Sequence, residues 1–250
     1  MQSLTHNGWT FSIQKSNIGT QEEIGKIEEL SGVHPAPDML FTGSSVVISR
    51  DCGFSLSFTP QDALRCCRYD SLTFPTSAFP VTRLRQLKVK NSQAWKAAAV
   101  DSNLLSEPAE VAHDWTFSTS YFGTLNGGRR VSEDEQGGTD RPPTTSKFLP
   151  LPLISDHTLP ILLMDEIPLW EDELHDNGHS EFVVRVRVTD KYWYVLTQFK
   201  LRVDGVAERE IACRYYWGYE GQEGAVLAEC QIKEDGRQGT VDVVRQRIVL

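Results

Sequence analysis

The sequence has no long hydrophobic run. No apolar stretch approaches the roughly 20 residues that a membrane-spanning helix needs. The segment Met1 to Trp9 also lacks the basic and apolar regions of a secretory signal peptide. We therefore expect a protein of the cytosol, with the nucleus as the second compartment to consider.

Cysteine is scarce, and its spacing is uninformative. The five cysteines form an odd set without any C-x-x-C pair. Such a set predicts neither a disulfide framework nor a zinc site. We expect reduced thiols at all five positions, which are Cys52, Cys66, Cys67, Cys213 and Cys230.

Basic charge and the common catalytic motifs are lacking as well. With 25 basic against 34 acidic side chains the net charge is -9, the wrong sign for a groove that follows nucleic-acid phosphates. The sequence has no G-x-S-x-G, P-loop, G-x-G-x-x-G or H-E-x-x-H motif, the usual local signatures of hydrolases, nucleotide enzymes and zinc proteases. These absences make a nucleic-acid partner a poor hypothesis and weaken the case for an enzyme.

The 250 residues include enough hydrophobic side chains, 40%, to fill a core. Alternating apolar residues predict strands beginning at Trp9, a hairpin over 46–58 and a central antiparallel hairpin over 182–203. Thr20 and Glu23 form a capping box at the start of a helix that ends before Gly32. Thr59 and Pro60 open a second helix, expected to reach about Tyr69.

Other segments have weaker patterns. Residues 84–99 have helical potential, and Trp115 to Tyr121 alternate like a strand. The glycine-rich, charged segment from Asn126 to Lys147 is expected to be a flexible insertion. Residues 206–250 form a divergent C-terminal segment whose pattern predicts no particular elements.

The densest polar cluster is Trp170 to His179, with sequence WEDELHDNGH. His175 and His179, with Glu171 and Asp172, are residue types that bind metal ions, so a metal-dependent hydrolase is the alternative function. Histidines four residues apart share a face only in a helix, however, and Asn177-Gly178 is a strong turn signal. An exposed, charged hairpin is the favoured interpretation.

If Ile167 to His175 is the first strand of this hairpin, the residues alternate between two faces. One face then carries Glu171, Glu173 and His175, while Trp170 and Asp172 lie on the other. The acidic stripe is either solvated or receives basic groups of a partner, with Trp170 as a packing anchor. On this interpretation Asp172 and Glu173 are both largely exposed.

Ser132 is a candidate phosphorylation site. It follows Arg129-Arg130-Val131 and precedes Glu133-Asp134-Glu135, a context that suits basic-directed or acid-directed kinases. The alternative is an unmodified serine in a solvated loop.

Four segments, in this order, resemble the TIP-forty-one-like family, also described as TOR signalling pathway regulator-like. They are Phe54 to Cys66, Asp114 to Leu125 (DWTFSTSYFGTL), Leu169 to Gly178 (LWEDELHDNG) and Phe199 to Val206 (FKLRVDGV). The resemblance covers roughly residues 9–205, which we take as one TIP-forty-one-like domain, 1–205, that includes the insertion 126–147. The insertion is longer than the family's loop, and the family pattern is lost after Val206.

The resemblance implies an α+β fold, a single domain dominated by antiparallel sheets with a few short helices, without a catalytic site, metal or cofactor. Members bind type 2A protein phosphatase catalytic subunits, and fungal members are linked to the Tap-forty-two-type phosphatase-associated protein in TOR signalling. A non-catalytic phosphatase regulator without nucleic-acid or membrane partners is therefore expected. Residues carried over as partner-binding candidates are Asp62, Asp156, Thr158, Glu171, Asp172, Glu173, His175 and Asp176.

Overall fold

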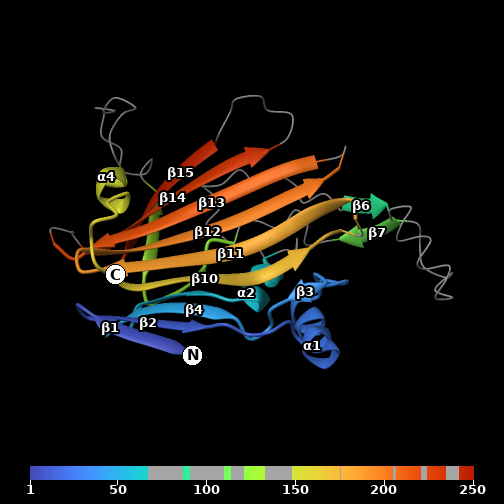
Figure 1. The fold of residues 1–250 in the computed structure, drawn as a ribbon, viewed down its shortest axis with the longest axis horizontal. Helices are drawn as coiled ribbons and strands as arrows, with labels where there is room; N and C mark the ends of the chain where they lie inside the picture. The colour runs from blue at the N-terminus through green and yellow to red at the C-terminus, as the bar shows by residue number, and fades with distance from the viewer. Residues whose placement is uncertain are drawn as a thin grey trace.

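The computed structural model describes residues 1–66, 87–90, 110–113, 121–132, 148–174, 176–204, 207–220, 224–234 and 242–250. Within these ranges the chain forms a five-stranded and an eight-stranded antiparallel sheet, a two-stranded ladder and three short helices (Figure 1). The α+β class with dominant antiparallel sheets is confirmed. No helix in these ranges is long and apolar enough to cross a membrane.

The smaller sheet is built from the N-terminal part of the chain. The predicted strand at Trp9 and the hairpin over 46–58 are confirmed, and the hairpin turn contains Gly53 with φ 87°. The sheet order is β1-β2-β4-β5-β8. These strands are β1 (Gln2–His6), β2 (Trp9–Gln14), β4 (Ser45–Arg50), β5 (Ser55–Phe58) and β8 (Thr124–Asn126).

The helices are short and begin where the sequence predicts. In α1 (Gln21–Ser31) the Thr20 side chain accepts the Glu23 N–H, and Glu23 accepts the Thr20 N–H, so the capping box is present. The helix α2 (Pro60–Arg65) ends four residues before the predicted Tyr69, because its last turn closes on Cys66. The third helix, α4 (Leu151–Ile154), was not predicted.

The larger sheet has the order β3-β10-β11-β12-β13-β14-β15-β9. Its long central strands confirm the predicted hairpin over 182–203. The members are β3 (Met39–Leu40), β10 (Ile161–Asp172), β11 (Gly178–Thr189), β12 (Tyr192–Val203), β13 (Ala207–Gly218), β14 (Ala225–Glu234), β15 (Asp242–Val249) and β9 (Arg129–Ser132).

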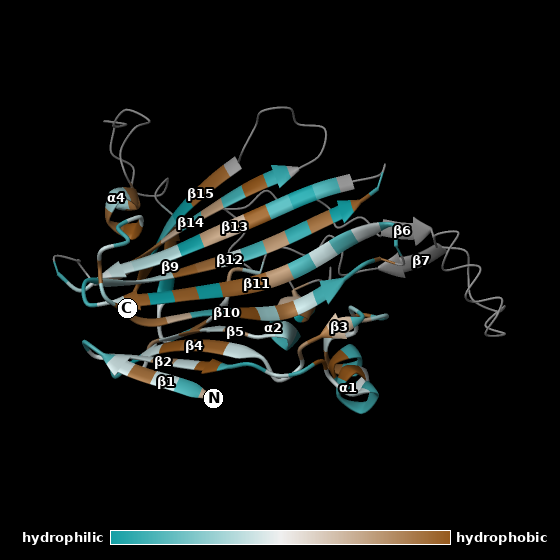
Figure 2. Cartoon of the chain, viewed as in Figure 1, coloured by the Kyte–Doolittle hydropathy of each residue, from teal (hydrophilic) through white to brown (hydrophobic). Residues whose placement is uncertain are grey.

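Aromatic side chains from both sheets meet in the core. The ring of Trp9 on β2 lies 5.1 Å from that of Trp193 on β12 and 5.0 Å from that of Trp217 on β13. Phe58 on β5 meets Tyr215 on β13 at 5.5 Å. Such edge-to-face pairs stabilise the contact beyond the area they bury. Figure 2 shows apolar and polar residues alternating along the larger sheet, so one face of each strand is available to this core.

Three expectations about the secondary structure are corrected. Residues 87–90, expected to be helical, form β6 (Leu87–Lys90), which pairs with β7 (Glu110–His113). Arg129–Ser132, expected in a flexible insertion, pair with β15, while 133–147 lie outside the described residues. The segment after 206 supplies β13, β14 and β15, which continue the sheet. The predicted strand from Trp115 falls on undescribed residues up to position 120.

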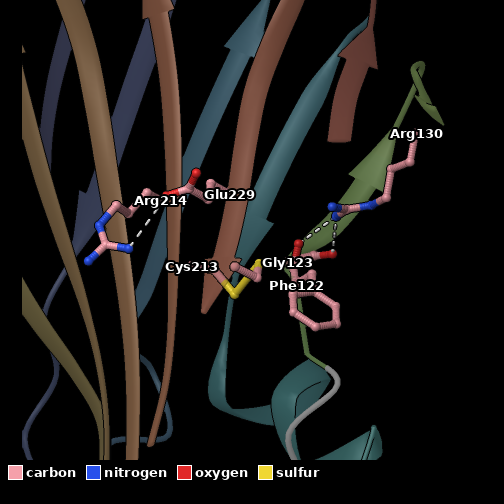
Figure 3. Close-up of a disulfide and its surroundings, with 7 residues drawn as sticks. Phe122, Gly123, Arg130, Cys213, Arg214 and Glu229 are labelled. Carbon is pink, nitrogen blue, oxygen red and sulfur yellow. Dashed lines mark hydrogen bonds and ion pairs between the residues drawn. A yellow bond between two sulfur atoms is a disulfide. The ribbon is translucent and has the colours of Figure 1, made fainter. Parts of the chain in front are cut away.

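The expectation of five reduced thiols is wrong for one pair. Cys213 and Cys230 are direct neighbours across β13 and β14 and form a disulfide (Figure 3). The sequence pattern missed it because the pairing depends on strands that the pattern did not predict. Cys52 and Cys66 are free, and burial together with the nearby Asp62 charge raises the pKa of the Cys66 thiol to about 11.

We expect reduction of the Cys213–Cys230 disulfide to lower the free energy of unfolding by about 3 kcal/mol. The bond spans 17 residues, and a crosslink of this span reduces the entropy of the unfolded chain by about that amount. Urea denaturation with and without a phosphine reductant measures the difference. Cys52→Ser, at an exposed free thiol, is the control and should respond to reductant as the wild type does. Equal stability of oxidised and reduced protein would contradict the prediction.

Candidate functional site

The acidic hairpin end lies where β10 passes through a turn into β11. Glu171, Glu173 and Asp176 are exposed there, as the sequence predicted for Glu171 and Glu173, and His175 lies outside the described residues. Asp176 has a positive φ of 63°, which shapes the turn. The turn closes tightly on β12, because a Cβ at Gly178 would overlap the backbone carbonyl oxygen of Arg202. Gly178 therefore allows the hairpin end to approach the backbone of β12 closely.

Asp172 is buried, and the expectation that it is exposed is wrong. Only 2% of its surface is accessible. Its Oδ2 accepts the Asp38 N–H at 2.7 Å, and its Oδ1 accepts the Leu174 N–H at 2.6 Å. This carboxylate holds the chain before β3 against the hairpin turn. Trp170 is also buried, at 1% exposure, so it is a core residue and not an anchor for a partner.

A cavity of about 590 Å³ opens beside the hairpin end, between the ends of β11, β12 and β13. Its carboxylates outnumber its cationic side chains. The carboxylates are Glu173, Asp176, Asp204, Glu208 and Glu210. The cationic side chains are Lys200, Arg202 and Arg209. Sequence reasoning missed Asp204, Glu208 and Glu210, because they reach Glu173 only through the pairing of β11 with β12 and of β12 with β13.

The rim of this cavity contains an ordered ion-pair group. Lys200 Nζ lies 2.6 Å from Glu181 Oε1, and His179 Nε2 lies 3.6 Å from Glu181 Oε2. Burial raises the pKa of Glu181, but the hydrogen bond and charge of Lys200, with His179, outweigh that effect and lower it. Glu210 has a lowered pKa because Lys233 donates a hydrogen bond to it. These carboxylates stay ionised at neutral pH.

Asp62 lies in the first turn of α2, with its side chain 28% exposed. Its N–H donates to Thr59 Oγ1 at 3.1 Å, and its Oδ2 accepts the Thr124 hydroxyl at 2.8 Å. Arg65 lies 3.7 Å from its other oxygen. Asp62 thus joins α2 to β8, and the carboxylate remains partly accessible to a partner.

Asp156 and Thr158 form a side-chain-closed turn between α4 and β10. Asp156 Oδ1 accepts the Thr158 N–H at 2.8 Å and its hydroxyl at 2.7 Å, and these bonds lower the pKa of Asp156. Arg187 fixes the turn from β11 by donating to the carbonyl oxygens of Ile154 and Asp156. The turn is exposed, and its conformation is set by the chain itself.

The candidate residues do not form one site. The Asp156 turn precedes β10 and the acidic hairpin end follows it, so the length of this twelve-residue strand separates them. At about 3.3 Å per residue that separation is roughly 35 Å. Figure 1 shows α4 and the β10–β11 turn at opposite ends of the sheet. Ser132 is at the far edge strand, opposite Gln246 of β15, and is half-buried.

The metal-site alternative receives no geometric support from its described members. Asp172 lies on the opposite face of the sheet from Glu171 and His179, because neighbouring strand residues alternate. Both Asp172 oxygens are occupied by backbone N–H groups. Within the ranges that the structure describes, no group of three or more His, Cys, Asp or Glu side chains could hold a metal ion.

Comparison with known proteins relates this chain to a family. The model of the TIP41-like family matches residues 39–240, which include the acidic hairpin end and the strands β13 and β14. The chain belongs to the TIP41-like family. The resemblance of the four sequence segments is thereby confirmed, and the match continues into β13 and β14, where the local motifs are lost.

Relatives of this TIP41-like chain occur in animals and fungi. The human TIP41-like protein is 28% identical over 227 residues, 90% of this chain and 74% of the human protein. The Caenorhabditis elegans TIP41-like protein is 31% identical over 208 residues, 82% of this chain and 64% of the relative. The Saccharomyces cerevisiae relative, named type 2A phosphatase activator TIP41, is 29% identical over 235 residues, 91% of this chain and 61% of its own length.

Proposed function

We propose that this chain is a non-catalytic regulator that binds type 2A protein phosphatase catalytic subunits and modulates TOR signalling. Membership of the TIP41-like family carries the proposal, because a relative aligned over 91% of this chain is named a type 2A phosphatase activator. A Tap-forty-two-type phosphatase-associated protein is the second partner that we propose. The cytosol, with the nucleus as a second compartment, is the proposed location.

The acidic hairpin end is the contact surface that we propose for the catalytic subunit. Glu171, Glu173 and Asp176 are exposed on a turn whose backbone is held by Asp172 and Gly178. Backbone contacts of this kind, made before a partner binds, reduce the conformational entropy that binding costs. Clustered carboxylates favour a basic patch on that partner and speed association at low salt.

Charge reversal at Glu171 and Glu173 tests this contact. We expect Glu171→Lys with Glu173→Lys to weaken the complex with a type 2A catalytic subunit at least tenfold at low salt, because like charges then face each other. Asp172 is excluded from this variant, since it is buried. The dissociation constant is measured by surface plasmon resonance at two salt concentrations.

Two comparisons make the result interpretable. Asp190→Lys with Glu220→Lys changes the net charge equally at exposed positions near the opposite end of the sheet, and it should bind like the wild type. Asp62→Ala tests the α2 contact instead. Loss only in Asp62→Ala would move the contact to α2, and equal binding by every variant would reject both assignments. Absence of binding by the wild type would reject the proposed function.

A further inference from the structure

In the described part of the chain, no strand pairs with one side of β10 along its first part. Of the strands in the described part of the chain, β11 pairs with β10 along its length, whereas β3 reaches the other side only at Trp170 and Glu171. The segment Ile161–Pro168 is thus an edge of the eight-stranded sheet (Figure 1). Edge strands present unpaired N–H and C=O groups to which another chain can bind.

The second part of this edge is protected. Pro168 has no N–H to offer. The Glu166 N–H donates to the Asp165 side chain at 2.9 Å, and Lys15, which follows β2, forms an ion pair with Asp165. Proline and charged side chains are the usual means by which proteins block edge pairing.

The first part of the edge, Ile161–Met164, contains neither a proline nor a charged side chain, although its pairing with β11 shifts by one residue between Ile161 and Leu163. Ile161, Leu162 and Met164 are 50%, 42% and 65% exposed. Because the Glu166 N–H bonds a side chain instead of β11, Glu166 directs its backbone groups to the open side. In an antiparallel strand, the backbone N–H and C=O groups of every second residue point to the same side. The register between Leu163 and Pro168 is regular, so Met164 directs its N–H and C=O to the open side, as Glu166 does.

We propose that Ile161–Met164 binds an extended, uncharged segment of a partner protein by strand addition. Backbone hydrogen bonds to Met164 would give affinity, and apolar side chains of the segment would cover Ile161, Leu162 and Met164. The nearby charges are already paired within the chain, Asp165 with Lys15 and Glu166 with Arg185, so the surface matches a neutral occupant. This inference is independent of the acidic hairpin end.

A second copy of the chain fits this edge less well. An open segment of four residues is only about 13 Å long at 3.3 Å per residue. Pairing of two such segments would bury far less than the roughly 1,600 Å² of a standard stable interface. An extended segment of a larger partner needs only this short edge, with the rest of the interface elsewhere.

Met164→Pro is the decisive variant. It removes the outward N–H while the proline ring meets solvent, as Pro168 already does four residues later, so the fold should persist. The probe is a labelled hexapeptide of alternating threonine and valine, acetylated and amidated, measured by fluorescence anisotropy on the full chain. We expect Met164→Pro to weaken binding at least tenfold and Met164→Val, which keeps the N–H, to bind like the wild type.

Further measurements separate the outcomes. Peptide should slow hydrogen exchange of the Met164 amide in the wild type, a readout that does not depend on any variant folding. The same peptide with methylated backbone nitrogens should not bind. Equal binding by Met164→Pro, an unchanged Met164 exchange rate, or tighter binding of a lysine–valine peptide would overturn the proposal. Dimerisation of the wild type that Met164→Pro abolishes would also overturn it, by assigning the edge to a second copy.

Discussion

Val186→Asp is expected to leave little folded protein at 25 °C. Val186 is 2% exposed on the inner face of β11, opposite Val195 of β12 and Asp165 of β10. A carboxylate there would be buried without a partner, which costs several kcal/mol. It would also face the Asp165 carboxylate directly across the strand pair, where like charges destabilise. Total stabilities are about 5–15 kcal/mol, so one such change removes much of the margin.

Thermal and urea denaturation of purified protein measure this effect. Val243→Asp is the matched control, because Val243 is a strand residue of the same sheet that is 42% exposed. Surface substitutions of this kind usually change stability by less than about 0.5 kcal/mol. If Val186→Asp melted at the same temperature as the control, Val186 would not be a core residue, and the register of β11 would be wrong.

The elements that the sequence predicts correctly are those with a local physical signal. The alternation of Trp9, Phe11 and Ile13 describes one face of β2, and all three are buried. The capping pair of Thr20 and Glu23 likewise acts within four residues. Both patterns involve residues only a few positions apart, so the strand and the helix start can be predicted without knowledge of the tertiary fold.

The strands that the sequence did not predict depend on distant partners. The sequence of Arg129–Ser132 predicts a charged loop. In the structure these residues form a strand by pairing with β15, more than a hundred residues later. In β13 the buried face consists of Ile211, Cys213, Tyr215 and Trp217, and its polar tyrosine and small cysteine weaken the apolar alternation. Strand formation here follows from non-local pairing and burial, which local propensity does not report.

The candidate site shows the same division. A hairpin with Ile167 to His175 as its first strand was predicted from Asn177-Gly178 and the alternation around it, so the exposed Glu171 and Glu173 were placed correctly, although β10 begins earlier, at Ile161. The cavity beside the hairpin end was not predicted, because its acidic residues also come from the ends of β12 and β13. The separation of Asp156 from Glu171 by the length of β10 was not predicted either. Resemblance between sequence segments does not show how far apart those segments lie in the folded protein.

Asp172→Ala is expected to lower the free energy of unfolding by about 3–4 kcal/mol. The variant removes the charged acceptor of the buried Leu174 N–H and of the part-buried Asp38 N–H, and a hydrogen bond to a charged group contributes about 1.5–3 kcal/mol. Asp172→Asn retains one acceptor oxygen and should lose about half as much. The loss should concentrate where the chain before β3 meets the hairpin turn, because Asp172 joins these two segments.

Glu173→Ala provides the contrast. The Glu173 carboxylate, next to Asp172 in the sequence, is exposed and should contribute less than about 0.5 kcal/mol to the free energy of unfolding. Urea denaturation gives the three free energies, and amide hydrogen exchange at Asp38 and Leu174 locates the loss. We expect Asp172→Ala to be the most destabilised variant, Asp172→Asn to be intermediate and Glu173→Ala to be the least destabilised, because Asp172 accepts the Asp38 and Leu174 N–H groups. If Asp172→Ala were as stable as Glu173→Ala, Asp172 would be available to a partner, and its exclusion from the charge-reversal variant would be unjustified.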